Sequence, residues 1–491
     1  MITRQDLNPN ALRAQYAVRG PIVERAQKLE AEGRKIIYCN IGNPQALKQK
    51  PITYLRQLLA LVEYPALMND SRTVAHFPAD VVQRARDVLA KHPHGTGAYS
   101  QSCGIPFVRR AVADFIARRD GIPASWERVI LTDGASGGVK LAVASLLKGP
   151  SDGIMVPTPQ YPLYSAEIAL RGGTRIDYAL DEDNEWQLSE AALSESVAGA
   201  RREGVTPVAI VVINPGNPTG AVLSHENIEM VIGFARRHRL TILADEVYQE
   251  NVYSAGRRFF SFAKAMHDAG EKDVSLVSYH SVSKGFLGEC GHRGGYMEFR
   301  NIPDDVMAEM AKLQSIALCS NVPGQLATYV MVAPPRPGDA SYASYVAERD
   351  GVLAQLKAKA ELLNKGVNAI EGMSLSLPQG AMYGFVRFEL PPEPGVDVAA
   401  MSADERRTYE AGRDNDYCLA LLEETGICVV PGSGFGQRPG TFHFRTTFLP
   451  PSDEIAELVG RLRTFHEKYV GRQPSAAGNQ PGERRAPTAV G

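Results

Sequence analysis

The middle of the chain alternates short apolar runs with longer amphipathic stretches. Several of the apolar runs are continuous and β-branched, as expected of strands that are buried on both faces. The stretches between them have the spacing of amphipathic helices, for example over 138–147 and 227–237. This rhythm predicts an α/β fold in which a mostly parallel sheet is flanked by helices. The predicted strands are 128–132, 153–156, 208–213, 240–244 and 274–278.

Two further regions flank this pattern. Residues 22–29 predict a helix that ends at Gly33, and a short strand is expected over 35–41. From about residue 349 a long helix begins, and shorter strands follow near 384–388 and 441–446. We therefore predict a second, smaller α+β domain that the N-terminal segment helps to complete. The predicted division is an N-terminal arm and part of the small domain over 1–50, a large domain over 51–349, the small domain over 350–470 and a disordered, Pro/Gly/Ala-rich tail over 471–491.

Composition narrows the class of protein. The 491 residues are 44% hydrophobic and 22% charged with a net charge of -2, which gives no electrostatic reason to expect nucleic acid or an anionic membrane as partner. No apolar run approaches the roughly 20 residues that a membrane helix needs, and the first residues lack the apolar core of a signal peptide. The six cysteines form no Cys-x-x-Cys pair, so neither a metal site nor disulfides are expected. The simplest prediction is a cytoplasmic enzyme with reduced thiols.

Ligands bind beyond the carboxyl ends of strands in an open parallel sheet, so the residues that follow each predicted strand matter most. After 128–132, the small residues from Asp133 to Gly138 lead into a helix whose free N–H groups and dipole suit a phosphate. After 208–213, Asn217 stands in a rigid turn between glycine and prolines, where its amide projects at the rim. Each turn taken alone also fits an ordinary tight loop.

The next two strand ends carry charge. Asp245 follows 240–244, and a carboxylate at a buried strand end needs a cationic partner. Lys284 follows 274–278 on a turn rich in Ser and Gly, with Arg293 nine residues later. A single lysine in a loop is usually solvated, so the prediction depends on the other polar and charged residues expected at the same rim. Pyridoxal phosphate needs this set: a lysine for a Schiff base, a carboxylate for the pyridine nitrogen, donors for the ring oxygen and an anion site.

The chain also resembles the fold-type-I aminotransferases, and within them the alanine aminotransferase group. INPGNPTG and ADEVYQ are typical of aminotransferases in general, whereas PQYPLYSA and GECGHRGGY are specific to the alanine group. The resemblance runs from Leu7 to about Leu449. The matching stretches are YAVRGPI (16–22), IGNPQAL (41–47), PQYPLYSA (159–166), INPGNPTG (213–220), ADEVYQ (244–249), SVSKG (281–285), GECGHRGGY (288–296), GAMY (380–383) and VPGSGFGQ (430–437).

The resemblance implies roles for the residues at the centre of the site. Lys284 would carry pyridoxal 5'-phosphate and move the proton between the substrate α-carbon and the cofactor. Asp245 would pair with the pyridine nitrogen, and Tyr248 and Asn217 would hydrogen-bond the ring oxygen. Tyr161 would stack on the ring. The reaction implied is amino transfer between L-alanine and 2-oxoglutarate by a ping-pong mechanism.

The resemblance also implies how the phosphate would be held. Ala135 and Ser136 at the helix start, together with Ser281 and Arg293, would bind it. Tyr99 would reach the phosphate of a neighbouring subunit, so a homodimer with shared active sites is implied.

For the substrate, Arg445 would bind the α-carboxylate with help from the backbone of Gly42 and from Asn217. The distal carboxylate of glutamate needs a further partner, for which Arg19 is a candidate, although a structural ion pair of Arg19 is an equally good interpretation.

Three alternatives remain open. The first keeps the fold and changes the substrate, as in glutamate–glyoxylate or broader-specificity aminotransfer. The second is a synthase that makes a cyclopropane amino acid from S-adenosylmethionine on the same scaffold, which the alanine-group motifs disfavour. The third is the effector domain of a transcription regulator, which would need a basic helix-turn-helix ahead of it. Such a region is not found before Tyr99.

Overall fold

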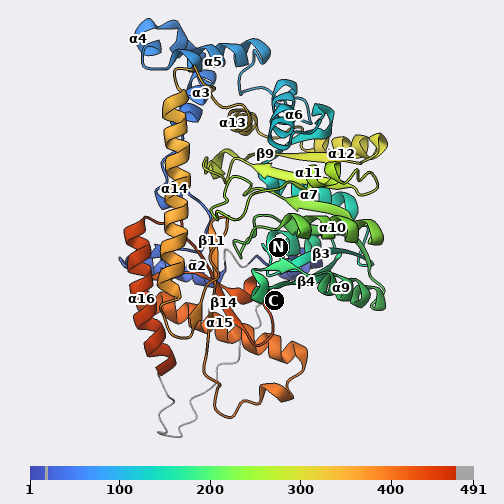
Figure 1. Cartoon of the computed structure of the whole chain (residues 1–491), viewed down its shortest axis with the longest axis vertical. Coiled ribbons are helices and arrows are strands. Elements are labelled where there is room, and N and C mark those ends of the chain that lie inside the picture. Colours follow the sequence, from blue (N-terminus) through green and yellow to red (C-terminus); the bar gives the residue numbers. More distant parts are fainter. Residues whose placement is uncertain (17–19, 472–491) are drawn as a thin grey trace.

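The computed structural model describes residues 1–16 and 20–471, and its centre is an eight-stranded sheet (Figure 1). Neighbouring strands from β8 through β7, β6 and β3 to β4 are parallel, whereas β9 runs antiparallel to both β2 and β8. The predicted, mostly parallel sheet is confirmed, although β4, β5 and β9 were not predicted. In spatial order the strands are β2 (Val129–Asp133), β9 (Gly294–Arg300), β8 (Leu276–Ser281), β7 (Thr241–Asp245), β6 (Thr206–Ile213), β3 (Asp152–Thr158), β4 (Thr174–Asp181) and β5 (Gln187–Leu188).

Helices cover both faces of this sheet, which explains the continuous apolar runs. Along β6, Ala209 and Val211 pack on the side of α7, α8 and α12, whereas Ile210 and Val212 pack on the side of α9, α10 and α11. Successive strand residues point to opposite faces, so a strand buried on both sides has no polar alternation. The helices are α7 (Gly134–Leu146), α8 (Leu163–Leu170), α9 (Glu190–Arg202), α10 (His225–His238), α11 (Phe262–Asp268) and α12 (Asp304–Ile316).

A second, smaller sheet lies beside the first. Its four antiparallel strands have the order β10-β11-β14-β13, and long helices pack on one side of it. The predicted smaller domain is therefore present, although its helix begins at Tyr342 rather than near residue 349. The elements are β10 (Met373–Ser374), β11 (Tyr383–Phe388), β13 (Val430–Pro431), β14 (Phe442–Thr447), α14 (Tyr342–Val367), α15 (Ala403–Thr425) and α16 (Ser452–Gly471).

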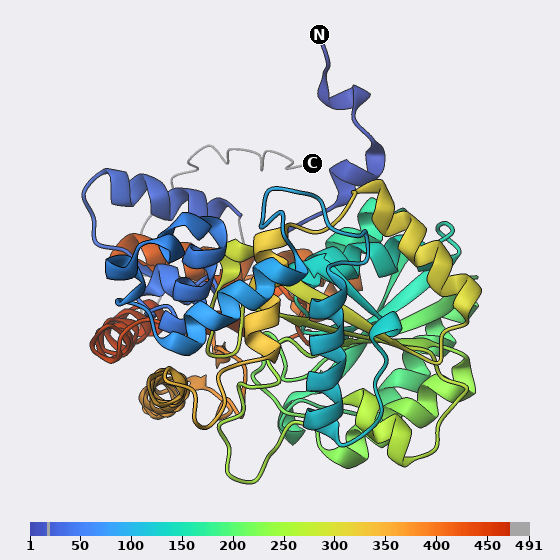
Figure 2. The ribbon, with the colours of Figure 1, turned by 90° about the horizontal axis from the view of Figure 1, so that it is seen from above.

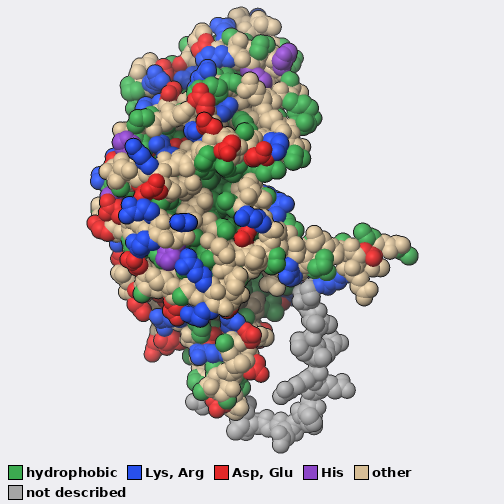
Figure 3. All heavy atoms as spheres, turned by 90° about the vertical axis from the view of Figure 1, so that its right-hand side faces the viewer, with side chains coloured by type: hydrophobic (Ala, Val, Ile, Leu, Met, Phe, Trp, Pro, Cys, Tyr) green, Lys and Arg blue, Asp and Glu red, His purple; other side chains and the backbone are tan. Residues whose placement is uncertain are grey.

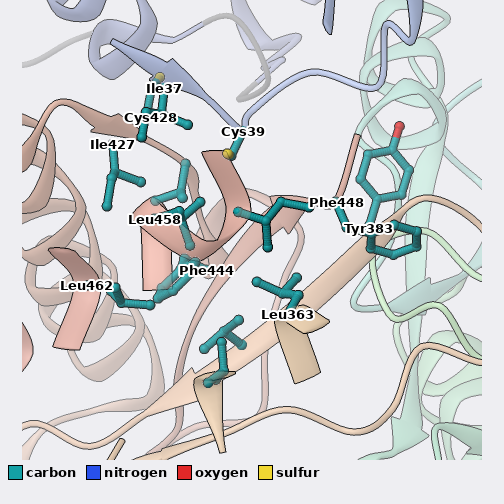
Figure 4. Packing of buried hydrophobic residues seen from close by; sticks show 14 of the residues in the cluster. Ile37, Cys39, Leu363, Tyr383, Ile427, Cys428, Phe444, Phe448, Leu458 and Leu462 are labelled. Atoms are coloured by element: carbon teal, nitrogen blue, oxygen red, sulfur yellow. The ribbon is translucent and has the colours of Figure 1, made fainter. Parts of the chain in front are cut away.

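The N-terminal segment packs with the elements of the second sheet. β1 (Ile37–Tyr38) pairs in parallel with β12 (Ile427–Cys428), and α2 (Pro21–Ala31) packs on the same core. Figure 4 shows Ile37 and Cys39 in one cluster with side chains from α14, α16 and β14. The strand is shorter than the predicted 35–41. The division at residues 50 and 349 stays a prediction.

The remaining helices form a third group around their own apolar cluster. Tyr345, near the start of α14, belongs to this cluster, whereas Leu356 and Leu363 further along α14 belong to the core of the small domain. One helix therefore ties both regions together, and Figure 1 shows it running along the side of the molecule. The group consists of α3 (Thr53–Glu63), α4 (Ser71–Val74), α5 (Ala79–Lys91), α6 (Pro106–Asp120) and α13 (Val322–Val332).

The ends and the surface complete the picture. The first residues, with α1 (Pro9–Arg13), extend from the body of the molecule (Figure 2). Lys/Arg and Asp/Glu side chains are intermixed on the face shown in Figure 3. Within residues 1–16 and 20–471, no helix is long and apolar enough to cross a membrane, and no cluster of His, Cys, Asp and Glu could hold a metal ion. The predicted tail, apart from Gly471, lies outside the described residues.

Candidate active site

A cavity of about 450 Å³ lies where the carboxyl ends of the large-sheet strands meet one face of the small sheet. Although β9 is antiparallel, its first residue lies at this same rim, which brings in Arg293 just before it. Eleven of the twelve predicted site residues line this one cavity. They are Gly42, Ala135, Ser136, Tyr161, Asn217, Asp245, Tyr248, Ser281, Lys284, Arg293 and Arg445.

One end of the cavity is built to receive an anion. α7 begins directly after β2, and Ala135 and Ser136 in its first turn line the cavity, where the unpaired N–H groups of a helix start favour an anion. Arg293 Nη2 donates to Ser136 Oγ at 3.0 Å and to the Asp133 carbonyl at 3.2 Å. Gly134 has a φ of 66°, and a Cβ there would stand 2.6 Å from Arg293 Nη2, so a side chain would strain the backbone and displace the arginine. Among the described residues no carboxylate pairs with Arg293, and its charge is left for a ligand.

Ser281 is the last residue of β8 and also lines the cavity. Its Oγ lies 3.2 Å from the Gly294 carbonyl oxygen and 3.0 Å from Ser283 Oγ, and it accepts a hydrogen bond of 3.1 Å from the Ser283 amide. These bonds fix the turn that leads to Lys284. Ser283 also lines the cavity and was not predicted.

The floor of the cavity carries Asp245 at the end of β7, 5% exposed. Its Oδ2 accepts a hydrogen bond of 2.8 Å from the Tyr164 hydroxyl, whereas its Oδ1 has no partner among the described residues. Burial raises the pKa of Asp245 to about 6, although the hydrogen bonds from Tyr164 and the Val247 amide and the charge of Lys284 oppose this shift. A buried carboxylate oxygen without a donor is costly and marks a place for a ligand N–H.

Lys284 reaches across the cavity toward the N-terminal segment. Its Nζ donates to the Gly42 carbonyl at 2.7 Å and lies 5.8 Å from the centre of the Tyr248 ring. Gly42 has no room for a side chain, because a Cβ there would stand 1.8 Å from Tyr383 Oη. The backbone at Gly42 is therefore held tightly against both the lysine and a tyrosine of the small domain.

Two tyrosine pairs line the walls. The Tyr248 hydroxyl donates to Tyr383 Oη at 3.3 Å, and the Tyr161 and Tyr16 hydroxyls lie 2.7 Å apart. Burial raises the pKa of Tyr161 and of Tyr248 well above its usual range. For Tyr383, burial acts in the same direction, but the positive charges of Lys284 and Arg445 prevail and lower the pKa.

Arg445 projects from β14 and is 1% exposed. Its guanidinium carbon lies 4.4 Å from the centre of the Tyr383 ring and 4.7 Å from that of Phe435. Nη1 donates to Asn217 Oδ1 at 3.2 Å and Nη2 donates to the Asn40 carbonyl, whereas Nε has no partner among the described residues. A buried guanidinium held against two aromatic rings is preorganised for a carboxylate.

Tyr99 does not join this cavity in its own chain. It is 76% exposed and lines a separate surface hollow with Arg84 and Arg110. Arg19 lies outside the described residues, so its candidate role stays untested.

Several lining residues were not predicted, because nothing in the local sequence distinguishes a tyrosine or cysteine of a site from one of a core. They are Tyr16, Tyr383, Cys290 and, behind Asp245, Tyr164.

Comparison with known proteins agrees with this geometry. A family profile described as aminotransferase class I and II matches residues 68–462. The chain is 47% identical to "Alanine aminotransferase 1, mitochondrial" of Arabidopsis thaliana, covering 96% of this chain and 87% of that one. It is also 47% identical to "Glutamate--glyoxylate aminotransferase 1" of the same plant, covering 94% and 95%. A solved alanine aminotransferase from Pyrococcus furiosus superposes with a TM-score of 0.75 at 26% identity, covering 94% and 100%.

Fold, site and family profile together define a pyridoxal-phosphate-dependent aminotransferase of fold type I. The chain belongs to the class I and II aminotransferases, and within them to the alanine aminotransferase group. The residues present fit that cofactor. Asp245 Oδ1, which has no partner among the described residues, suits a pyridine N–H, and Arg293 with the start of α7 suits a phosphate.

The predicted cytoplasmic location is wrong by this comparison. Relatives from Arabidopsis thaliana and Dictyostelium discoideum are named mitochondrial. The prediction failed because it depended on the absence of an apolar signal core and on scattered cysteines. Mitochondrial targeting segments are amphipathic and have no such core.

Proposed function

We propose that this enzyme transfers the amino group between L-alanine and 2-oxoglutarate, giving pyruvate and L-glutamate. The observation that carries the proposal is the convergence of Lys284, the partnerless oxygen of Asp245 and the buried Arg445 in one cavity. The names of relatives that match nearly the whole chain support alanine as the amino donor.

Pyridoxal phosphate, when bound, supplies an electron sink that stabilises negative charge at the substrate α-carbon. In this proposal Lys284 would hold the cofactor, and its free amine would carry the proton that leaves the substrate α-carbon. Asp245 would accept the N–H of the pyridine nitrogen. Tyr248 and Asn217 would donate to the ring oxygen, and Tyr161 would cover the ring.

The other residues bind and orient. Ala135 and Ser136 at the start of α7, with Ser281 and Arg293, hold the phosphate. Arg445 binds the α-carboxylate that alanine, glutamate and both oxo acids share, which is how one pocket serves both half-reactions.

The proposal includes a homodimer in which Tyr99 enters the cavity of the partner subunit. The high exposure of Tyr99 in the single chain supports it, since an exposed aromatic side chain is available to a second copy. Mixing a Tyr99→Ala subunit with a Lys284→Ala subunit tests this idea. Shared sites predict that hybrids regain activity, because one of the two sites then has both residues intact. Separate sites predict no activity beyond that of the Tyr99→Ala subunits alone.

Rapid-mixing absorbance measurements test the reaction itself. Alanine should convert the visible absorbance of the bound cofactor to that of its aminated form, and 2-oxoglutarate or pyruvate should reverse the change. Alanine that leaves the spectrum unchanged at saturating concentration would contradict the proposal.

A second candidate is glutamate–glyoxylate amino transfer, favoured by the relative of that name at equal identity. The same measurement separates the two. If glyoxylate restores the original spectrum at least as efficiently as pyruvate and 2-oxoglutarate, this second function is the better description.

A further inference from the structure

The small sheet presents two chemically different faces. Along β11 and β14, Val386 and Phe444 point into the core formed with α14, α15 and α16. Side chains one residue away point to the opposite face, toward the large domain. On that face stand Tyr383, Phe385, Arg387, His443 and Arg445.

A continuous contact path on this face leads away from Arg445. The guanidinium packs on Phe435, and the Phe435 ring meets Phe385 edge-on at 6.1 Å. Phe385 in turn stacks on His443 with ring centres 4.5 Å apart and planes inclined by only 3°. His443 and Arg445 are two residues apart on one strand, so displacement of one moves the other.

The path ends on a carboxylate of the large domain. His443 Nε2 lies 3.0 Å from Glu182 Oε1, and Arg387 Nη1 lies 3.6 Å from Glu182 Oε2. Glu182 follows β4 directly, in the short 3-10 helix Glu182–Asn184. It therefore contacts two cross-strand neighbours, since His443 and Arg387 face each other in the register of β11 and β14.

The contact is well shielded and its partners are fixed. The His443 side chain is 1% exposed and that of Glu182 is 14% exposed. His443 Nδ1 lies 3.2 Å from Gln437 Oε1, and the Gln437 amide nitrogen donates to Asp414 at 3.0 Å. Both ring nitrogens thus face oxygen atoms, so a proton on either nitrogen has an acceptor. A partly buried charged hydrogen bond of this kind orients its groups strongly.

We infer that Glu182 and His443 are positioning residues for Arg445. The carboxylate of Glu182 holds the site-facing surface of the small sheet against the edge of the large sheet, and thereby sets the place of the guanidinium relative to the cofactor. The inference rests on the proposed function, because it assigns Arg445 to the substrate carboxylate. Neither residue lines the cavity, so they act only through Arg445.

The neighbouring residue supplies a matched control. Asp183 also reaches the small domain, where its Oδ2 lies 3.2 Å from Arg438 Nη1, but its side chain is 70% exposed. Exposed pairs of this kind contribute little. Replacing Asp183 therefore removes an ion pair between the same two regions without touching the path to Arg445.

The experiment compares Glu182→Ala, Glu182→Gln and Asp183→Ala in steady-state kinetics. Glu182→Ala should raise the KM for alanine and for 2-oxoglutarate about tenfold and lower kcat less than about threefold, because ground-state carboxylate binding is weakened. Glu182→Gln, which keeps an oxygen for His443, should recover most of the loss. Arg387→Gln should act in the same direction as Glu182→Ala but less strongly. Asp183→Ala should match the unaltered enzyme.

A second readout does not depend on turnover. Trp186 packs edge-on against Phe385 and His443, at 5.8 and 6.0 Å between ring centres, so its fluorescence reports on this path. The sequence has two tryptophans, and Trp126 is replaced by phenylalanine so that only Trp186 contributes. In this Trp126→Phe background, titration with 2-oxoglutarate should change the fluorescence, and Glu182→Ala should weaken the apparent affinity about tenfold.

The outcomes separate the two proposals. Unchanged KM values and affinity in Glu182→Ala, or equal effects of Glu182→Ala and Asp183→Ala, overturn the positioning role and leave the proposed function intact. Failure of the unaltered enzyme to aminate its cofactor from alanine overturns the proposed function instead.

Discussion

The two sides of the cavity are built differently. The side assigned to the cofactor consists of the carboxyl ends of parallel strands and the turns beyond them: Asp245 ends β7, whereas Asn217 and Lys284 follow β6 and β8. The side assigned to the substrate is the flat face of an antiparallel sheet, from which Tyr383 and Arg445 project. Turns at a rim place backbone N–H groups and short polar side chains near a ligand, whereas a sheet face places long side chains in parallel.

This difference separates the task of holding the cofactor from the task of binding the substrate. The rim belongs to one rigid layer with helices on both faces, so the groups assigned to the cofactor keep fixed distances from one another. Arg445 stands on a separate layer and depends on contacts between the two sheets. Changes on the rim should therefore alter the chemistry, and changes on the sheet face should alter substrate binding.

Lys284→Ala should have the largest effect. Without the amine, the proton has no carrier, and turnover should fall by at least about 10⁴-fold. The visible absorbance of the bound cofactor should also change, because the covalent link is absent. Lys264→Ala is a suitable control, since that lysine lies outside the cavity and pairs with Asp268. A variant that keeps both the absorbance and the turnover would remove Lys284 from its role.

Asp245→Asn comes next, and it should separate activity from stability. Turnover should fall roughly 10²- to 10³-fold because the pyridine nitrogen loses its anionic partner. Burial raises the pKa of this carboxyl from 3.8 to about 6. The stabilisation of its neutral form is complete below pH 4 and is lost as pH rises through 6, so the charged group is a cost at pH 8.

The cofactor-free Asp245→Asn protein should therefore be more stable at pH 8 by about 1–3 kcal/mol. Denaturant unfolding at pH 8 and pH 4 measures this, and the gain should disappear at the lower pH. Equal stability of the two proteins at pH 8 would show that the buried charge is compensated.

Arg445→Lys tests the sheet-face side. An ammonium cannot reproduce the flat, two-pronged contact of a guanidinium with a carboxylate, so the KM for alanine and for 2-oxoglutarate should rise about 10²-fold. The absorbance of the bound cofactor should stay as in the unaltered enzyme. If kcat fell while KM held, the division of labour between the two sides would be refuted.

Tyr383→Phe should have the smallest effect, a few-fold at neutral pH, because the ring that packs on Arg445 is kept. The charges of Lys284 and Arg445 lower the pKa of Tyr383, so its phenolate forms sooner than that of an ordinary tyrosine and competes for Arg445 as pH rises. The variant should therefore bind alanine at alkaline pH better than the parent does. Profiles of the KM for alanine from pH 7 to 10 measure this. If the two proteins show the same rise in KM at alkaline pH, the phenolate does not compete for Arg445.

The same contrast explains what could be predicted from the sequence. Asp245 and Lys284 stand out because a charged residue at the end of an apolar strand has no place in a core. Tyr383 does not stand out, because an aromatic residue in a half-buried strand looks the same whether it faces a core or a ligand. Figure 4 shows Tyr383 at the edge of the small-domain cluster with its hydroxyl directed away from the aliphatic side chains.

Long-range pairing limited the prediction in a second way. Tyr164 donates to Asp245 from a helix 81 positions earlier, and Glu182 reaches His443 across 261 positions. Local periodicity carries no information on such pairs. The motif identified Arg293, but the sequence did not predict that β9 runs antiparallel to β8, which is what brings Arg293 to the rim.

The pairing of β1 with β12 bears on how the protein is made. A ribosome releases Ile37 early and Ile427 only near the end of synthesis, yet the two residues are partners in a separate two-stranded sheet of the small domain. The large domain can begin to fold while the chain is still growing, whereas the small domain must wait with its first strand exposed. A nascent chain stalled before residue 427 should therefore carry an unsatisfied apolar edge around Ile37 and Cys39, which is the kind of surface that chaperones bind.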